Sequence, residues 1–224
     1  MITGAAFCPH PPVLVPEVAQ AAAAELDGLR AACRDAIRRV ASSGVQLVVI
    51  GSAEGWQHHE PTARGSLAGY GVDREIPLGS DEPGPVELPL SLTIAAWLLR
   101  DALGPNCGAV GRSVAAGRER LDLPTGPTAL LVMGDGSGRR STAAPGYLDE
   151  RAAEVDAQVA AALAAGDPDR LAPRPELADE LLVAGWPAWS AAAGVLAGGR
   201  WDAELLYDDA PYGVGYFVAA WTVR

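Results

Sequence analysis

The sequence contains no lysine. All 17 of its basic residues are arginines, and they face 28 acidic residues, which gives a formal net charge of −11. A phosphate-binding P-loop requires a lysine, and no Gly-x-Gly-x-x-Gly motif follows an expected strand, so neither type of nucleotide site is supported. Proteins that bind a phosphate backbone present a basic face to it. We therefore expect no nucleic-acid partner.

Cysteine is also scarce. Cys8, Cys33 and Cys107 are widely spaced and form no Cys-x-x-Cys pair, which argues against a disulfide framework and against a zinc ribbon. No basic segment followed by an apolar stretch opens the chain, and no apolar run approaches the roughly 18 residues that cross a bilayer. We expect a cytoplasmic protein that is neither secreted nor inserted in a membrane.

Only three histidines are present, His10, His58 and His59, and all lie within the first 59 of the 224 residues. A serine or cysteine triad needs a histidine base that a third group orients. No Gly-x-Ser-x-Gly elbow accompanies these histidines. Hydrolase chemistry of that type is not expected.

The residues that are present indicate one large α/β domain covering residues 1–224. Hydrophobic residues make up 49% of the chain, enough for a single sizeable core. Apolar runs predict strands, and helical spacing of apolar residues predicts helices between them. The expected strands are 2–8, 45–50, 128–133, 203–207 and 214–223, and the expected helices are 19–41, 90–103, 147–165, 175–184 and 187–196. Residues 51–87 are expected to be mostly loop. This alternation predicts helices on both faces of a parallel or mixed sheet.

Ligands of such sheets bind beyond the carboxyl ends of the strands. His10 follows the first expected strand, residues 51–60 follow the second, and residues 134–140 follow a later one. These are the places where a site is expected.

Three segments carry motifs in a common order. They are Cys8-Pro9-His10-Pro11-Pro12, then Pro145-Gly146-Tyr147, and finally Pro211-Tyr212-Gly213-Val214-Gly215-Tyr216. Together they resemble segments of LigB-type proteins, the superfamily that includes the class III extradiol ring-cleavage dioxygenases and the Memo proteins. The resemblance extends over nearly the whole chain. It implies a LigB-like three-layer α/β/α fold with a central mixed sheet.

In active members of that superfamily, two histidines and one carboxylate hold Fe(II) and leave positions open for the substrate and O₂. The resemblance places His10 at the first ligand position. Where the family has its second histidine, the chain has Glu54, with His58 and His59 a few residues further on. Asp208 or Asp209 corresponds to the third ligand. Each has a simpler interpretation: His10 shapes a turn, the adjacent histidines are solvated, and the aspartates stabilise a turn.

The acid/base histidine of the family is also missing, because Gly138 follows Ser137 at its position. We therefore expect a wider cleft there, lined by Ser137, by Arg139 or Arg140, and by Tyr212 of the third motif. The two arginines either bind a carboxylate as planar forks or form a solvated or salt-bridged pair. His10, the 51–60 loop, residues 134–138 and Asp208 are expected to converge on one cleft.

Two functions follow from this comparison. The first is a pseudoenzyme that binds a small molecule or a protein partner. Members of the superfamily often self-associate, so the resemblance is compatible with a homo-oligomer for either function. The second is a metal-dependent oxidoreductase with a rebuilt ligand set of His10, Glu54 or His58, and Asp208. Such an oxygen-rich set suits Mn²⁺ or Mg²⁺ better than Fe(II).

Overall fold

The computed structural model describes residues 1–117 and 121–224. Within them, one seven-stranded sheet has the order β3-β6-β2-β7-β1-β9-β8. Its strands are β1 Ile2–Cys8, β2 Gln46–Ser52, β3 Gln57–His59, β6 Val110–Val114, β7 Thr128–Met133, β8 Trp201–Asp209 and β9 Tyr216–Val223. The four central strands β6, β2, β7 and β1 are parallel, while β3, β9 and β8 run antiparallel to their neighbours. The sheet is therefore mixed, as the sequence predicted.

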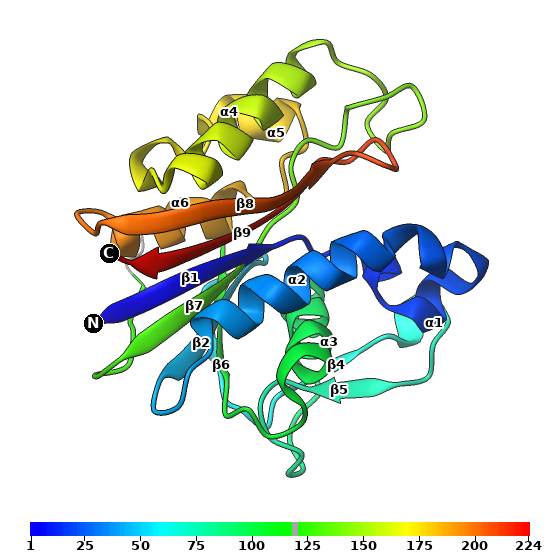
Figure 1. Cartoon of the computed structure of the whole chain (residues 1–224). Coiled ribbons are helices and arrows are strands. Elements are labelled where there is room, and N and C mark those ends of the chain that lie inside the picture. Colours follow the sequence, from blue (N-terminus) through cyan, green and yellow to red (C-terminus); the bar gives the residue numbers. More distant parts are fainter. Residues whose placement is uncertain (118–120) are drawn as a thin grey trace.

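Helices cover both faces of this sheet (Figure 1). One face carries α2 Asp27–Val40 and α3 Leu90–Leu103, and the other carries α4 Arg151–Ala165, α5 Pro175–Glu180 and α6 Trp186–Leu196. The short elements are α1 Pro16–Ala19, the 3₁₀ helices η1 Pro12–Leu14, η2 Gln20–Leu26, η3 Ala68–Tyr70 and η4 Pro168–Arg170, and a small second sheet of β4 Arg64–Ser66 and β5 Glu75–Pro77. The predicted three-layer α/β/α architecture is confirmed.

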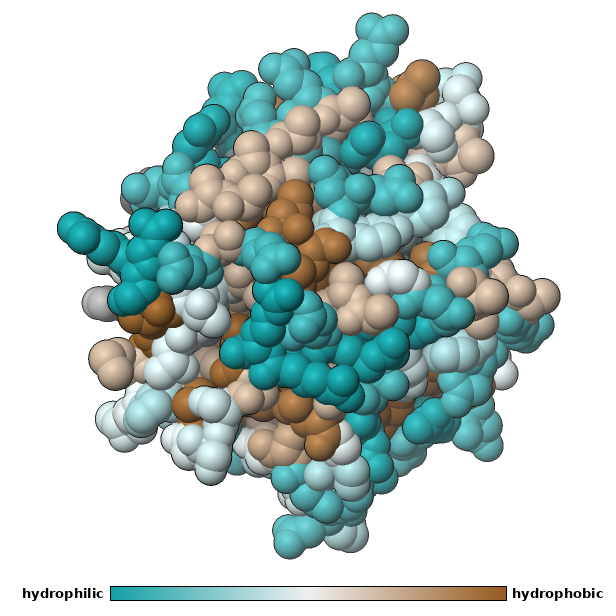
Figure 2. All heavy atoms as spheres, in the orientation of Figure 1, coloured by the Kyte–Doolittle hydropathy of each residue, from teal (hydrophilic) through white to brown (hydrophobic). Residues whose placement is uncertain are grey.

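Apolar patterning explains how these layers pack. Every residue of β7 is buried, as expected for a central strand that helices cover on both faces. In α2, Leu29, Cys33, Ile37 and Val40 recur at helical spacing and form a buried stripe. The outer side of the molecule over α2 is rich in hydrophilic side chains in Figure 2. None of the helices in the described ranges has the length and apolar character needed to span a membrane.

Several boundaries differ from those predicted. The helix predicted at 19–41 is α-helical only from Asp27, because η2 precedes it. The prediction missed β6, in which Gly111, Arg112 and Ser113 interrupt the apolar pattern. Residues 51–87, predicted to be mostly loop, contribute three short strands. The helix at 90–103 and the strand at 128–133 have the predicted bounds.

Candidate functional site

A row of polar side chains lies at the ends of three adjacent strands. His10 follows β1, Asp135 follows β7, and Tyr216 begins β9. The register places them side by side, because Cys8 pairs with Met133 and Phe7 pairs with Ala219. The backbone N–H of His10 donates to Oδ1 of Asp135 at 2.7 Å, and the ring Nδ1 lies 3.6 Å from the same oxygen.

This row is almost closed to solvent. His10 is 8% exposed, Asp135 9% and Tyr216 3%. Burial raises the pKa of the Asp135 carboxyl, an effect that His10 partly offsets. Burial, and then the negative charge of Asp135, raise the pKa of Tyr216 well above its ordinary value. Within the described residues, Nδ1 of His10 is buried and forms no hydrogen bond.

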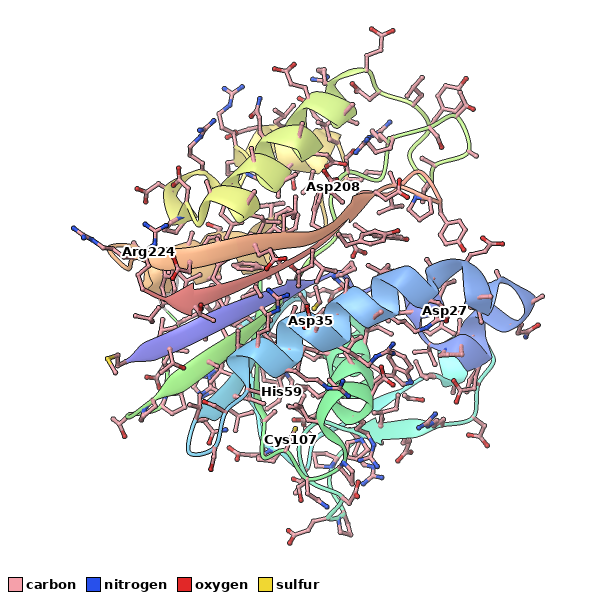
Figure 3. The ribbon with its side chains drawn as sticks, viewed as in Figure 1. Asp27, Asp35, His59, Cys107, Asp208 and Arg224 are labelled. Carbon is pink, nitrogen blue, oxygen red and sulfur yellow. The ribbon has the colours of Figure 1, made fainter. Side chains whose placement is uncertain are left out.

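Asp208 belongs to a different cluster on the other face of the sheet. It pairs with Phe217, whose side chain packs on the α4 side, whereas the neighbouring Tyr216 packs on the α2 side. Figure 3 shows Asp208 between β8 and α4. Burial raises the pKa of Asp208, while the Arg140 guanidinium lowers it. Side chains of consecutive strand residues point to opposite faces, so Asp208 shares the face of Phe217, while the row of His10, Asp135 and Tyr216 lies on the face of Tyr216. The prediction that Asp208 and His10 line one cleft is therefore wrong.

The centre of that second cluster is Asp156 of α4, which the sequence analysis did not single out. It is 1% exposed and accepts hydrogen bonds from the backbone N–H of Ser137 and from Arg140, both at 2.8 Å. Burial raises its pKa, and these two donors work in the opposite direction. Gly136 and Gly215 make room for it, since a Cβ at either would collide with the carboxylate.

Glu54 and His58 do not approach His10 either. Glu54 is exposed in the loop after β2, and His58 is exposed on β3 at the sheet edge. Because β6, β2 and β7 lie between β3 and β1, four inter-strand spacings of about 4.8 Å separate the two strands. His58 on β3 therefore lies about 19 Å from β1, the strand that His10 follows. The predicted ligand set of His10, Glu54, His58 and Asp208 is thus not assembled. No three histidine, cysteine or acidic side chains meet to hold a metal anywhere in residues 1–117 and 121–224, so this donor set does not fit Fe(II), Mn²⁺ or Mg²⁺.

The expected widening at Gly138 is also absent. Its N–H donates to the carbonyls of Leu181 and Leu182, and a Cβ on Gly138 would lie 3.3 Å from Cβ of Leu182. Ser137 is fully buried, and its hydroxyl donates to the Leu181 carbonyl at 2.7 Å. The segment after α5 therefore takes up the space beside Gly138, the position at which the resemblance to LigB-type proteins implies a missing imidazole.

The side chains predicted to line that cleft are engaged within the chain. Arg139 donates to the carbonyl of Gly146. Arg140 forms the ion pair with Asp156, so it is salt-bridged, one of the two alternatives for this residue. The hydroxyl of Tyr212 donates to Glu25 of η2 at 2.9 Å, which joins the C-terminal motif to the segment ahead of α2.

His59 is buried, whereas the simpler interpretation of the sequence placed both adjacent histidines in solvent. It is 1% exposed, with Nδ1 3.2 Å from Oε1 of Glu87 and Nε2 3.2 Å from Oγ of Ser113. Ser113 Oγ also lies 3.2 Å from the carbonyl of Gly55. The order of groups is that of a nucleophile, base and orienting acid. Ser113 is buried within β6, however, so the network ties β3 and its preceding loop to the sheet.

Neither a model of a known protein family nor a curated protein matches this chain. The likeness to LigB-type proteins therefore rests on the three motifs and their order.

Proposed function

We propose that this chain is a LigB-like pseudoenzyme, which binds a small molecule or a protein partner and does not cleave aromatic rings. The observation that carries the proposal is the environment of His10. Its backbone and ring both lie against the buried Asp135, and only a tenth of its side chain is exposed. An imidazole in this setting supports the first motif structurally and offers little room for a catechol.

The absence of the family's second ligand histidine and of its acid/base histidine supports the same proposal. The residues nearest in sequence to the second ligand, Glu54 and His58, lie toward the β3 edge of the sheet. The base position is Gly138, against which Leu182 packs. General acid–base help is worth about 10² to 10⁴ in rate, but losing a metal ligand as well removes the centre on which that chemistry depends.

The direct test is an assay for ring cleavage. Protein incubated anaerobically with Fe(II) and then given O₂ with catechol or protocatechuate should form no more yellow ring-opened product than its His10→Ala variant. Product formation that His10→Ala abolishes would refute the proposal.

A rebuilt metal site around His10 makes a different prediction. Mn²⁺ or Fe²⁺ would then raise the melting temperature, since a ligand that binds only the folded state stabilises it. We expect neither ion to raise the melting temperature, either of the native chain or of a His10→Ala, Asp208→Ala double variant.

We also propose a cytoplasmic location, which the three free thiols support.

A further inference from the structure

An open cavity of about 530 Å³ lies between α4 and the segment that follows it, and no residue of the His10 row lines it. One wall is a face of α4, where Glu154, Val155, Gln158 and Val159 recur at helical spacing. The opposite wall comes from residues 170–177. Val155 and Val159 are almost fully buried, so they form an apolar floor.

Two arginines at this cavity, Arg170 and Arg174, differ from most others in the chain. Both are exposed, and neither side chain forms an ion pair or hydrogen bond with another described residue. Most other described arginines bind a carboxylate or a backbone carbonyl, as Arg140 and Arg139 do. Acidic residues outnumber arginines by 28 to 17, so partners are plentiful. Two guanidinium groups that have no partner among the described residues therefore lie at one cavity, where a ligand can reach them.

We propose that this cavity binds a small organic anion that carries a carboxylate or phosphate group on an apolar body. Guanidinium forks match the geometry of carboxylate and phosphate oxygens, and they bind both bidentately. The valine floor, with Leu177 on the facing wall, accommodates the apolar part. The Gln158 amide supplies a further hydrogen-bonding group. This site is independent of the proposed function, because no residue of the LigB-like motifs contributes to it.

The remaining charges at the cavity set the strength of binding. Arg151 is already paired with Asp149 and Glu180, so it offers little to a ligand. Glu154 carries a negative charge, and its Oε1 accepts a 3.4 Å hydrogen bond from Gln158. Glu154 therefore opposes Arg170 and Arg174, and it leaves the site with moderate affinity for anions.

The test is a ¹H–¹⁵N NMR titration of the whole chain in a phosphate-free buffer, with phenyl phosphate, inorganic phosphate and phenol as probes. Phenyl phosphate should shift the amide signals of α4 and residues 168–177, with inorganic phosphate binding more weakly and phenol not binding at the same concentrations. Raising the ionic strength from about 0.01 M to about 1 M shortens the screening length from roughly 30 to 3 Å and should weaken binding. Phenol producing the same shifts would overturn the proposal.

Variants then assign the binding to the two arginines. Arg170→Ala with Arg174→Ala should weaken phenyl phosphate binding on the order of tenfold, given exposed charge-assisted hydrogen bonds. Arg200→Ala is the matched control, because Arg200 is also exposed and has no described side-chain partner but lies outside the cavity. Glu154→Gln should tighten binding. Unchanged affinity in the double variant, an equal loss in the control, or weaker binding by Glu154→Gln would each overturn the proposal.

Discussion

The backbone N–H of His10 donates to the carboxylate of Asp135, which lies 125 residues further along the chain. This hydrogen bond joins the loops that leave two neighbouring parallel strands, β1 and β7. It gives the buried carboxylate a fixed donor and holds the Pro-His-Pro-Pro segment against the sheet. The first motif is thus anchored by a side chain of the 134–138 segment, which the sequence analysis expected to lie near His10.

Replacing Asp135 tests this anchor. Asp135→Ala leaves the His10 N–H buried without an acceptor, which should lower the free energy of unfolding by about 1–3 kcal/mol. Asp135→Asn keeps an acceptor oxygen and should cost much less. Urea denaturation measures both, with the exposed Asp73→Ala as control. Equal losses for the alanine and asparagine variants would contradict the role of the hydrogen bond.

The buried carboxyl should also leave a signature in the pH dependence of stability. Burial raises the pKa of Asp135 above 3.8, so between that value and the raised one the folded state holds a proton that the unfolded state has released. The contribution of Asp135 is therefore largest below pH 3.8 and falls as the pH rises through this window. Asp135→Asn should remove this decline, as measured by urea denaturation at a series of pH values.

Asp149 should behave in the opposite way. Hydrogen bonds from Arg151 lower its pKa from 3.8 to about 2, so any stability that it contributes is present above pH 3.8 and is lost as the pH falls toward 2. The Asp149→Asn variant should therefore approach the native chain in stability under acidic conditions. The stability difference between the native chain and each asparagine variant should thus change with pH in opposite directions at Asp135 and Asp149. A change in the same direction at both residues would show that one assignment of sign is wrong.

Gly136 should tolerate no side chain. A Cβ there would lie 2.7 Å from Oδ1 of Asp156 and 2.8 Å from Cε2 of Phe217. Gly136→Ala should destabilise the fold by about 1–3 kcal/mol because the neighbouring groups must shift. Gly194→Ala is the control: Gly194 lies in α6 with nothing within 4 Å of its Cβ position, and alanine should stabilise that helix by up to about 1 kcal/mol. Thermal unfolding of the two variants should thus shift in opposite directions.

The adjacent histidines offer another matched pair. His59→Ala removes a buried ring and both of its polar contacts, which should cost about 2–4 kcal/mol. His58→Ala changes an exposed side chain and should stay within about 0.5 kcal/mol of the native chain. Hydrogen exchange of the β3 and β6 amides should report the loss locally. Similar effects of the two substitutions would rule out the structural role of the His59 network.

Strong local patterns were enough to predict most of the fold. Residues 128–133 form a short run of apolar residues, and 90–103 have helical apolar spacing, so the sequence defined their bounds. β6 could not be predicted in the same way, because its strand character comes from pairing with β2 and β3 and not from its own residues. Tertiary pairing of this kind leaves no signal in a short sequence window.

The site was harder to predict for a related reason. Asp156 lies on a helix that reads as an ordinary amphipathic segment, and only the fold places it against Ser137 and Arg140. The burial of His59 had a signal, since one of two adjacent residues on a strand must point inward. That signal was hidden because residues 51–87 were predicted to be mostly loop.

The pairing of β1 with β9 has a consequence for how the chain acquires its structure. The two strands are hydrogen-bonded neighbours, with Phe7 opposite Ala219, although more than two hundred residues separate them. Closing so long a loop is entropically unfavourable, and contacts of this range slow folding. During synthesis one edge of β1 must wait for β9, the last strand of the sheet to be made. A nascent chain stalled before Tyr216 should therefore expose that edge and be prone to aggregate.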